Sequence, residues 1–243
     1  MLKKSYSMMD KNGILYGIGV GPGEPELMTL KALRIIRSCD VIVLPAASKE
    51  ACYAYKIAYE VCPEIEEKIL MCMPFPMIQD EEELELAHEK NYHEIEDYLC
   101  EGKNVGMLTI GDPSVYSTYL YMHKRALVDG KTARIINGVP SFCAAAARLG
   151  IGLGENTQEI HIIPASYSIA DALQYHGVCI YMKSGKKLQQ LIEALKEQIK
   201  SGRKYEIYAV SDCSMPTERV YRGLEEAAEA SGYLTIVIVK EIQ

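Results

Sequence analysis

Apolar runs and helical patterns alternate along the first part of the chain. Two short continuous apolar runs, at residues 14–18 and 41–44, flank a segment at residues 30–38 whose apolar face begins with Leu30. Thr29, directly before this segment, is a typical N-cap residue. An uninterrupted apolar run is typical of a parallel strand that is covered on both faces. The pattern therefore predicts a strand–helix–strand unit with a right-handed crossover and a parallel sheet.

The segment after the second apolar run predicts two more helices around an irregular stretch. Residues 48–62 have a helical pattern that ends before Pro63, and residues 79–100 predict a long acidic helix. Between them, residues 71–77 (MCMPFPM) contain two prolines and are expected to be extended and irregular. The inner side of the long helix is expected to be formed by Leu84, Ala87, Ile95 and Leu99.

A third apolar run, at residues 105–110, leads into Gly111, Asp112 and Pro113. Glycine permits a sharp turn, aspartate is a strong N-cap residue, and proline is favoured at the first helical position. We therefore expect a helix that begins at Pro113. Tyr116 is expected at the edge of its buried face, toward a cleft. The buried stripe itself would contain Val115, Tyr119, Met122 and Ala126.

Four glycines alternate with other residues between Gly17 and Gly23. Such a stretch bends sharply and brings the backbone close to a partner, either a ligand or another part of the chain. The spacing does not fit the dinucleotide fingerprint, because its last glycine position is occupied by Pro22 or Glu24. Glu24 and Glu26 also make the stretch a poor phosphate site. The residues alone leave a ligand loop and a tight turn equally open.

A third special turn follows Ile135–Ile136, where NGVPSF opens a helix of small residues at 143–147. In open parallel sheets, ligands bind just beyond the C-terminal ends of the strands. The turns at Gly19, Gly111 and Gly138 all occupy that position. We therefore expect a ligand site at this edge of the sheet.

The second half of the chain predicts another α/β unit. Glycines at positions 150, 152 and 154 indicate a linker, so we expect domains at residues 1–154 and 155–243. A helical stripe runs from Leu188 to Ile199 and ends before Gly202. Strands are expected at residues 161–164, 178–182, 205–210 and 234–239.

Composition narrows the classes of function. The 243 residues carry a net charge of −7, which argues against nucleic acid or an anionic membrane as the main partner. No apolar stretch approaches the ~20 residues of a membrane span, and the lysines near the N-terminus precede no signal-peptide core. Eight cysteines without a CxxC pair are typical of reduced thiols in a cytoplasmic protein.

The histidines do not predict a metal site. His88 and His93 lie five residues apart, so on a helix they point roughly 140° away from each other, whereas zinc-binding helices use a spacing of four. His161 lies in an apolar run and is expected to be a core side chain. We therefore expect no metal.

Six segments, in this order, closely resemble the tetrapyrrole methylases, which transfer a methyl group from S-adenosylmethionine (SAM). They are GIGVGPGEPELMTLKA, LTIGDPSVYST, NGVPSFCAAAARLGI, VCIYMK, PTERV and YLTIVIV. The resemblance runs from Ile14 to the C-terminus. It implies two α/β domains, with a mainly parallel sheet in the first and a mixed sheet in the second. It also implies SAM folded in the cleft between them and held largely by backbone groups.

The resemblance assigns SAM contacts position by position. They are Pro22, Gly111, Asp112, Val115, Ser141, Phe142, Met182, Cys213, Tyr233, Leu234 and Thr235. Two residues depart from the family pattern, since Asn137 stands where proline is usual and Cys213 stands where glycine is frequent.

Within the family, VLPAAS, GDPSVYST and GVPSFCAAAARLGI resemble the branch that methylates C20 of precorrin-2 or its cobalt form during cobalamin synthesis. Pro45 stands where the uroporphyrinogen-methylating members carry aspartate, which counts against that substrate. The alternatives are a methylase acting at C11 or C17, or diphthine synthase. A nucleotide-binding regulator without catalysis is the alternative from another class, and it would bind neither SAM nor S-adenosylhomocysteine (SAH).

Such a reaction needs few catalytic side chains. The meso carbon of a reduced tetrapyrrole is already nucleophilic and the sulfonium is already activated, so alignment in a dry cleft is the main requirement. Tyr116 is expected to orient the tetrapyrrole, with a purely structural core position as the alternative. The resemblance and the apolar MCMPFPM stretch together predict a homodimer.

Overall fold

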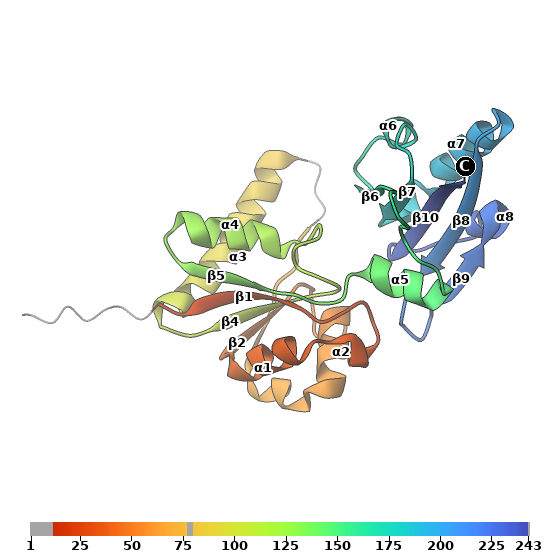
Figure 1. The fold of residues 1–243 in the computed structure, drawn as a ribbon. Coiled ribbons are helices and arrows are strands. Elements are labelled where there is room, and N and C mark those ends of the chain that lie inside the picture. Colours follow the sequence, from red (N-terminus) through yellow and green to blue (C-terminus); the bar gives the residue numbers. More distant parts are fainter. Residues whose placement is uncertain (1–11, 77–79, 243) are drawn as a thin grey trace, which may run out of the picture. The chain divides into compact units, whose positions relative to one another are not determined.

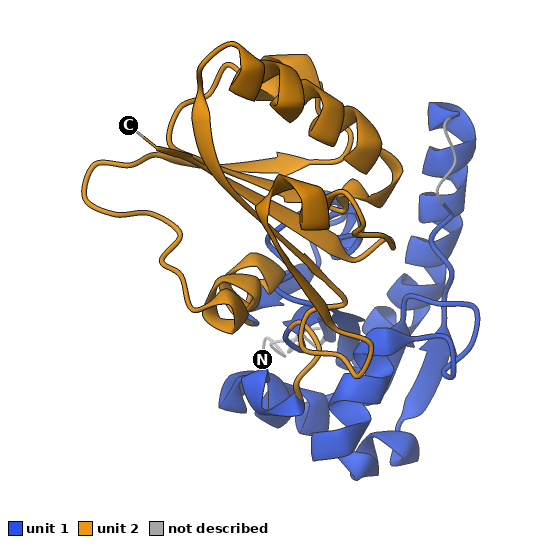
Figure 2. Cartoon of the chain, turned by 90° about the vertical axis from the view of Figure 1, so that its right-hand side faces the viewer, with its two compact units in different colours: residues 1–21, 25–138 blue, residues 22–24, 139–243 orange. Residues whose placement is uncertain are grey.

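The computed structural model describes residues 12–76 and 80–242, which form two compact units (Figure 2). Unit 1 contains the described residues of Met1–Gly21 and Pro25–Gly138, and unit 2 contains those of Pro22–Glu24 and Val139–Gln243. The domain boundary expected after residue 154 lies within unit 2. These units are groups of residues in mutual contact, so the division into domains at residues 1–154 and 155–243 stays a prediction.

Unit 1 is built on a five-stranded sheet in which all pairings are parallel. The strand order is β3-β2-β4-β1-β5. The strands are β1 (Ile14–Gly19), β2 (Val41–Leu44), β3 (Ile69–Cys72), β4 (Val105–Thr109) and β5 (Thr132–Ile136). All residues of β2 and β4 are buried, as continuous apolar runs predict for central parallel strands. The mainly parallel sheet expected for the N-terminal half is confirmed.

Helices cover both faces of this sheet (Figure 1). Helices α1 (Leu30–Ser38) and α2 (Tyr53–Val61) pack on one face with the 3-10 turn η2 (Pro63–Glu67). Helices α3 (Glu81–Cys100) and α4 (Tyr119–Val128) pack on the other. A short turn, η1 (Pro25–Leu27), precedes α1.

The local predictions in unit 1 hold for most of the elements. Thr29 caps α1, because its side chain accepts a hydrogen bond from the amide of Ala32. The prediction that Leu30 belongs to the buried face of α1 is wrong, since 85% of Leu30 is exposed and Ala32 and Ile36 are the buried residues. Helix α2 begins at Tyr53, five residues after the expected start.

The stretch at residues 71–77 departs from its prediction in two ways. It begins as strand β3 rather than as an irregular segment. Met73 is buried and Phe75 packs against the core, so the part of this stretch up to residue 76 offers less apolar surface than expected. Residue 77 lies outside the described residues.

Unit 2 is built on a mixed five-stranded sheet of order β6-β7-β10-β8-β9. Only β6 and β7 pair in parallel, so the mixed sheet expected for the C-terminal half is confirmed. The strands are β6 (Ile160–Pro164), β7 (Val178–Met182), β8 (Lys204–Ser211), β9 (Arg219–Arg222) and β10 (Thr235–Ile242).

The helices of unit 2 form its core against one face of the sheet. They are α6 (Ile169–Ala172), α7 (Leu188–Lys200) and α8 (Gly223–Ala227). Helix α5 (Ser141–Leu149) contacts the central strand β10, and the 3-10 turn η3 (Ser184–Lys186) follows β7. Throughout residues 12–76 and 80–242, every helix is too short or too polar to cross a bilayer.

Candidate functional site

Three loops of unit 1 leave the same edge of the parallel sheet and meet through glycine. They follow β1, β4 and β5, and each carries a glycine at or just after the strand end: Gly19, Gly111 and Gly138. A Cβ atom added to Gly138 would lie 2.1 Å from the carbonyl oxygen of Gly111, and one added to Gly19 would lie 2.6 Å from the same oxygen. Real Cβ atoms essentially never come closer than 3.0 Å to another heavy atom. Glycine is therefore required for this contact, and the close partner of Gly19 is another part of the chain.

Main-chain hydrogen bonds join the first two loops. The amide of Val20 donates to the carbonyl of Thr109 at 3.0 Å, and the amide of Gly111 donates to the carbonyl of Gly21 at 2.8 Å. Gly21 and Gly111 both adopt positive φ, at 80° and 73°. These backbone conformations favour glycine, so the alternating glycines of the first loop serve both its bend and its contacts.

Asp112 joins the second loop to the third. Its Oδ1 accepts from the amide and the hydroxyl of Ser114, at 2.8 and 2.5 Å. Its Oδ2 accepts from the Asn137 carboxamide and the Gly138 amide, each at 3.1 Å. Burial opposes the charged form, but the hydrogen bonds from Ser114, Asn137 and Gly138 outweigh it and hold the pKa of Asp112 below its ordinary value. Asp112 therefore acts as an anionic link between two loops.

The prediction that Asp112 caps a helix beginning at Pro113 is wrong. Residues 113–118 form a turn, and α4 begins only at Tyr119. The Asp112 carboxylate accepts from the amide two residues on, as in an Asx turn, and no helix begins directly after it. Tyr116 has a φ of 45°, which a right-handed helix does not permit.

Because α4 begins at Tyr119 instead of Pro113, Tyr116 lies in the preceding turn and not on a helix. The predicted stripe is confirmed for Tyr119, Met122 and Ala126, while Val115 is half-buried within the turn. Tyr116 is 44% exposed, so neither the helix-edge position nor the alternative of a core side chain is correct. Its strained backbone in a loop at a sheet edge is typical of a functional segment.

In unit 2, residues 22–24 of the first loop pack on the segment after β8. A Cβ added to Gly23 would lie 2.6 Å from the carbonyl oxygen of Ser214 and 2.9 Å from that of Cys213. Pro22 and Cys213 are both buried. Two of the predicted site residues, Pro22 and Cys213, are thus brought into one local cluster.

Four other predicted residues of unit 2, Met182, Tyr233, Leu234 and Thr235, lie at one end of its central strands. Met182 ends β7 and pairs with Ile236 at the start of β10, while Thr235 pairs with Ser211 at the end of β8. Tyr233 is 46% exposed, and the Lys183 ammonium lies 5.7 Å from the centre of its ring. Ser141 and Phe142, also in unit 2, are the first two residues of α5.

The hydroxyl of Thr235 is already used within the protein. It donates to the carbonyl of Ser231 at 2.8 Å and therefore accepts from the Ser211 hydroxyl, 2.9 Å away. Thr235 is fully buried. The side chain of Thr235 is therefore held within the protein, and its contact with SAM stays a prediction.

Backbone strain is concentrated in the same loops. Lys183, Asp212 and Ser214 have φ values of 56°, 50° and 64°, and they are three of the five non-glycine residues with positive φ in the described part of the chain. Such conformations cost about 1–3 kcal/mol each and occur often at ligand sites. The strain thus marks the C-terminal ends of β7 and β8 as a candidate binding region.

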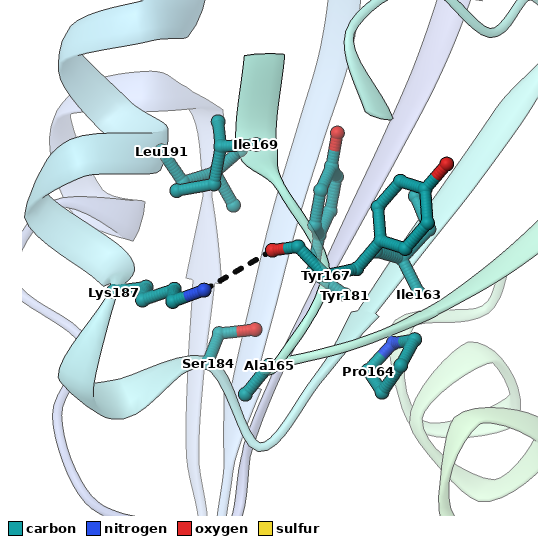
Figure 3. A pocket seen from close by; sticks show the side chains of 9 residues that line it. All are labelled: Ile163, Pro164, Ala165, Tyr167, Ile169, Tyr181, Ser184, Lys187 and Leu191. Carbon is teal, nitrogen blue, oxygen red and sulfur yellow. Dashed lines mark hydrogen bonds between the residues drawn. The ribbon is translucent and has the colours of Figure 1, made fainter. Parts of the chain in front are cut away.

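A small hollow lies beside this region, between β6, β7 and α7 (Figure 3). Its lining is mostly apolar, and Lys187 reaches across it to donate to the carbonyl of Tyr167 at 3.1 Å. Its volume of about 10 Å³ suits a single water molecule. The hollow is therefore too small for a cofactor.

His88 and His161 each pack against a tyrosine ring. The His88 ring lies 4.3 Å from that of Tyr121, and burial lowers the pKa of His88. The His161 ring stacks on Tyr175 at 4.4 Å, as a partly buried side chain at the edge of unit 2. Within the described residues, no three histidine, cysteine or acidic side chains group as metal ligands.

Comparison with known families identifies the fold. Residues 14–229 match the model of the Tetrapyrrole (Corrin/Porphyrin) Methylases. The chain belongs to the tetrapyrrole methylase family. Among curated tetrapyrrole methylases, it is 33% identical over 235 residues to the probable cobalt-precorrin-2 C(20)-methyltransferase of Methanocaldococcus jannaschii, covering 94% of this chain and 96% of that protein. It is 32% identical over 219 residues to the cobalt-precorrin-2 C(20)-methyltransferase of Salmonella typhimurium, covering 88% and 90%.

Solved tetrapyrrole methylase structures share the architecture at lower identity. A cobalt precorrin-4 methyltransferase aligns with a TM-score of 0.72 at 20% identity, covering 93% of this chain and 94% of that one. A uroporphyrin-III C-methyltransferase from Thermus thermophilus, complexed with S-adenosylhomocysteine, aligns with a TM-score of 0.68 at 20% identity, covering 94% and 97%. These likenesses support the two α/β units described above.

Sequence reasoning missed several partners of the predicted site residues in this tetrapyrrole methylase. Ser114 and Asn137 hold Asp112, Ser211 holds Thr235, and Ser214 contacts Gly23. A signal was present for Ser114, because Asp-Pro-Ser is as typical of an Asx turn as of a helix start. No signal existed for Ser211 and Ser214, whose partners lie on distant parts of the sequence.

Proposed function

We propose that this protein transfers a methyl group from SAM to C20 of precorrin-2 or of its cobalt-containing form, cobalt-precorrin-2 or cobalt-factor II. The observation that supports this most directly is the similarity to two C20-methyltransferases, at 32–33% identity over most of each chain. We infer the SAM-dependent activity from membership of the family, and the position of methylation from these two relatives.

Two features of the loops support SAM as the methyl donor. When bound, SAM supplies an activated methyl group on a sulfonium. We assign its binding in unit 1 to the loop at Gly111, Asp112 and Val115. In unit 2 we assign it to Pro22, Ser141, Phe142, Met182, Cys213 and residues 233–235. Glycine-rich turns and strained strand ends can present main-chain groups to a ligand, and this chain has a positive-φ glycine at Gly111 and strained residues directly beside Met182 and Cys213.

The chain's own task is to bind, orient and exclude water. Asp112 has four hydrogen bonds from protein donors and is 7% exposed, so it organises the loops rather than acting as a general base. Tyr116 has a partly exposed ring beside these loops, and we assign it to orienting the tetrapyrrole. Its ring can lie against the macrocycle while its hydroxyl forms a hydrogen bond.

We also propose a homodimer in the cytoplasm. The apolar surface that supports a dimer lies on α4, where Tyr121, Leu127 and Val128 are 50%, 53% and 82% exposed. Tyr121 and Val128 lie seven residues apart and thus share one face of the helix, and exposed apolar side chains on one face favour a protein interface.

The deciding experiment is incubation with SAM and either precorrin-2 or cobalt-factor II. We expect one added methyl by mass spectrometry and its location at C20 by NMR with labelled SAM. A methyl at C11 or C17 would contradict the assigned position, and the absence of SAM and SAH binding would contradict a methyltransferase altogether.

A further inference from the structure

Asn137 lies where three parts of unit 1 meet. It follows Ile136, the last residue of β5, which pairs with Ile18 of β1. Its carboxamide donates to Asp112 Oδ2 at 3.1 Å, and its carbonyl accepts from the Thr29 hydroxyl at 3.2 Å. One residue thus links the loop after β5 to the loop after β4 and to the start of α1.

The two oxygens of Asp112 have different tasks. Oδ1 accepts only from Ser114, within the same loop. Oδ2 accepts from Asn137 and Gly138, which belong to the loop after β5. The cross-loop connection is therefore made by Oδ2 alone, and the carboxamide of Asn137 is its single side-chain donor among the residues described in the structure.

The adjacent Gly138 is the residue that the connection holds in place. It packs against Gly19 and against the carbonyl of Gly111 with no room for a Cβ atom. A displacement of the loop after β5 would therefore change the position of all three glycine turns together. Asn137 itself is exposed, so water can replace its hydrogen bond, and its removal is expected to affect loop position more than overall stability.

We propose that Asn137 is a positioning residue that acts through Asp112 to set the affinity of the glycine loops for SAM. This inference rests on the proposed function, because it requires that these loops bind SAM or SAH. It concerns a residue that departs from the family pattern and that has no assigned part in methyl transfer.

The test replaces the neutral donor with a second acid. In Asn137→Asp, two carboxylates lie within hydrogen-bond distance, so they repel when both are ionised and share a proton when one is neutral. We expect the dissociation constant of SAH, measured by calorimetry, to be about tenfold weaker than wild type at pH 8 and to return to within about threefold at pH 5.5. Dividing the dissociation constant of the variant by that of wild type at the same pH cancels any effect of the titration of SAH itself.

The matched control is Asn156→Asp, which adds the same charge in an exposed loop of unit 2. The ratio of its SAH dissociation constant to that of wild type should stay constant between pH 5.5 and 8. If Asn137→Asp does not fold at pH 8, Asn137→Ala decides. That variant should bind SAH at least about threefold more weakly at every pH, with little change in melting temperature.

The possible failures are distinguishable. If wild type does not bind SAH, the proposed function fails. If wild type binds SAH, but Asn137→Asp shows a pH-independent ratio and Asn137→Ala binds normally, the positioning role is overturned and Asn137 is an ordinary loop residue.

Discussion

Replacement of Gly138 by alanine tests the glycine contact at the centre of unit 1. The new Cβ would lie 2.1 Å from the carbonyl oxygen of Gly111, whereas real Cβ atoms stay at least 3.0 Å away. The two loops must therefore separate by about 1 Å. The hydrogen bond from the Gly138 amide to Asp112, now 3.1 Å long, would be lost at that separation.

The expected loss can be estimated from this geometry. A hydrogen bond to a charged group contributes about 1.5–3 kcal/mol, so we expect Gly138→Ala to lower the free energy of unfolding by about 2 kcal/mol. For a protein of this size, that corresponds to a decrease of roughly 4–8 °C in the melting temperature. Because the displaced loop is assigned to SAM binding, the affinity for SAH should also fall by about tenfold or more.

Gly152→Ala is the matched control. Its φ is not positive, and the nearest atom to an added Cβ is a glutamate side-chain oxygen at 3.9 Å, so it should melt and bind SAH like wild type. Thermal unfolding and calorimetry on both variants give the comparison. If Gly138→Ala melts at the wild-type temperature and binds SAH with unchanged affinity, the argument from the glycine contact is refuted.

Three further predictions concern Asp112, Tyr116 and the assembly state. Asp112→Ala removes the acceptor of four hydrogen bonds and should lower stability by about 3 kcal/mol and SAH affinity by tenfold or more. The folded-state pKa of Asp112 is below its ordinary value, so the ionised carboxylate stabilises the fold above about pH 4. This stabilisation is lost as the pH falls through the folded pKa. The free energies of unfolding of wild type and Asp112→Ala should therefore become equal in acid. Tyr116→Phe should leave SAH binding unchanged and lower methyl transfer by about 1 kcal/mol, or roughly fivefold, and an unchanged rate would remove the hydroxyl from the reaction. Light scattering at micromolar concentration should give the mass of a dimer, whereas a monomer would contradict the proposed assembly.

The sheets could be predicted because burial on both faces leaves a strong pattern. Val41–Leu44 is a continuous apolar run and forms a central parallel strand. Strand β9 and helix α8 were not predicted, since Arg219–Arg222 is a short edge strand with polar ends and Gly223–Ala227 has few residues over which a pattern can repeat.

The start of α4 shows where local signals are insufficient. Asp112-Pro113 suits a helix N-terminus, yet the same residues suit an Asx turn. What decides between them is the second set of donors, Asn137 and Gly138, which lie about 25 residues later in the sequence. Similarly, the alternating glycines after β1 predicted that the backbone lies close to a partner. That partner is the pair of loops after β4 and β5, and it could not be predicted because it depends on the pairing of β1 with these two strands.

The position of residues 22–24 has a consequence for the order of folding. These three residues belong to unit 2, although the chain on either side of them belongs to unit 1, and Gly23 packs on Ser214, about 190 residues later. Contacts between such distant residues form late, because the intervening chain must first be brought together. During synthesis, the parallel sheet of unit 1 can assemble while the first glycine loop still lacks its C-terminal partner. A fragment consisting of residues 139–243 would therefore lack part of its own packing.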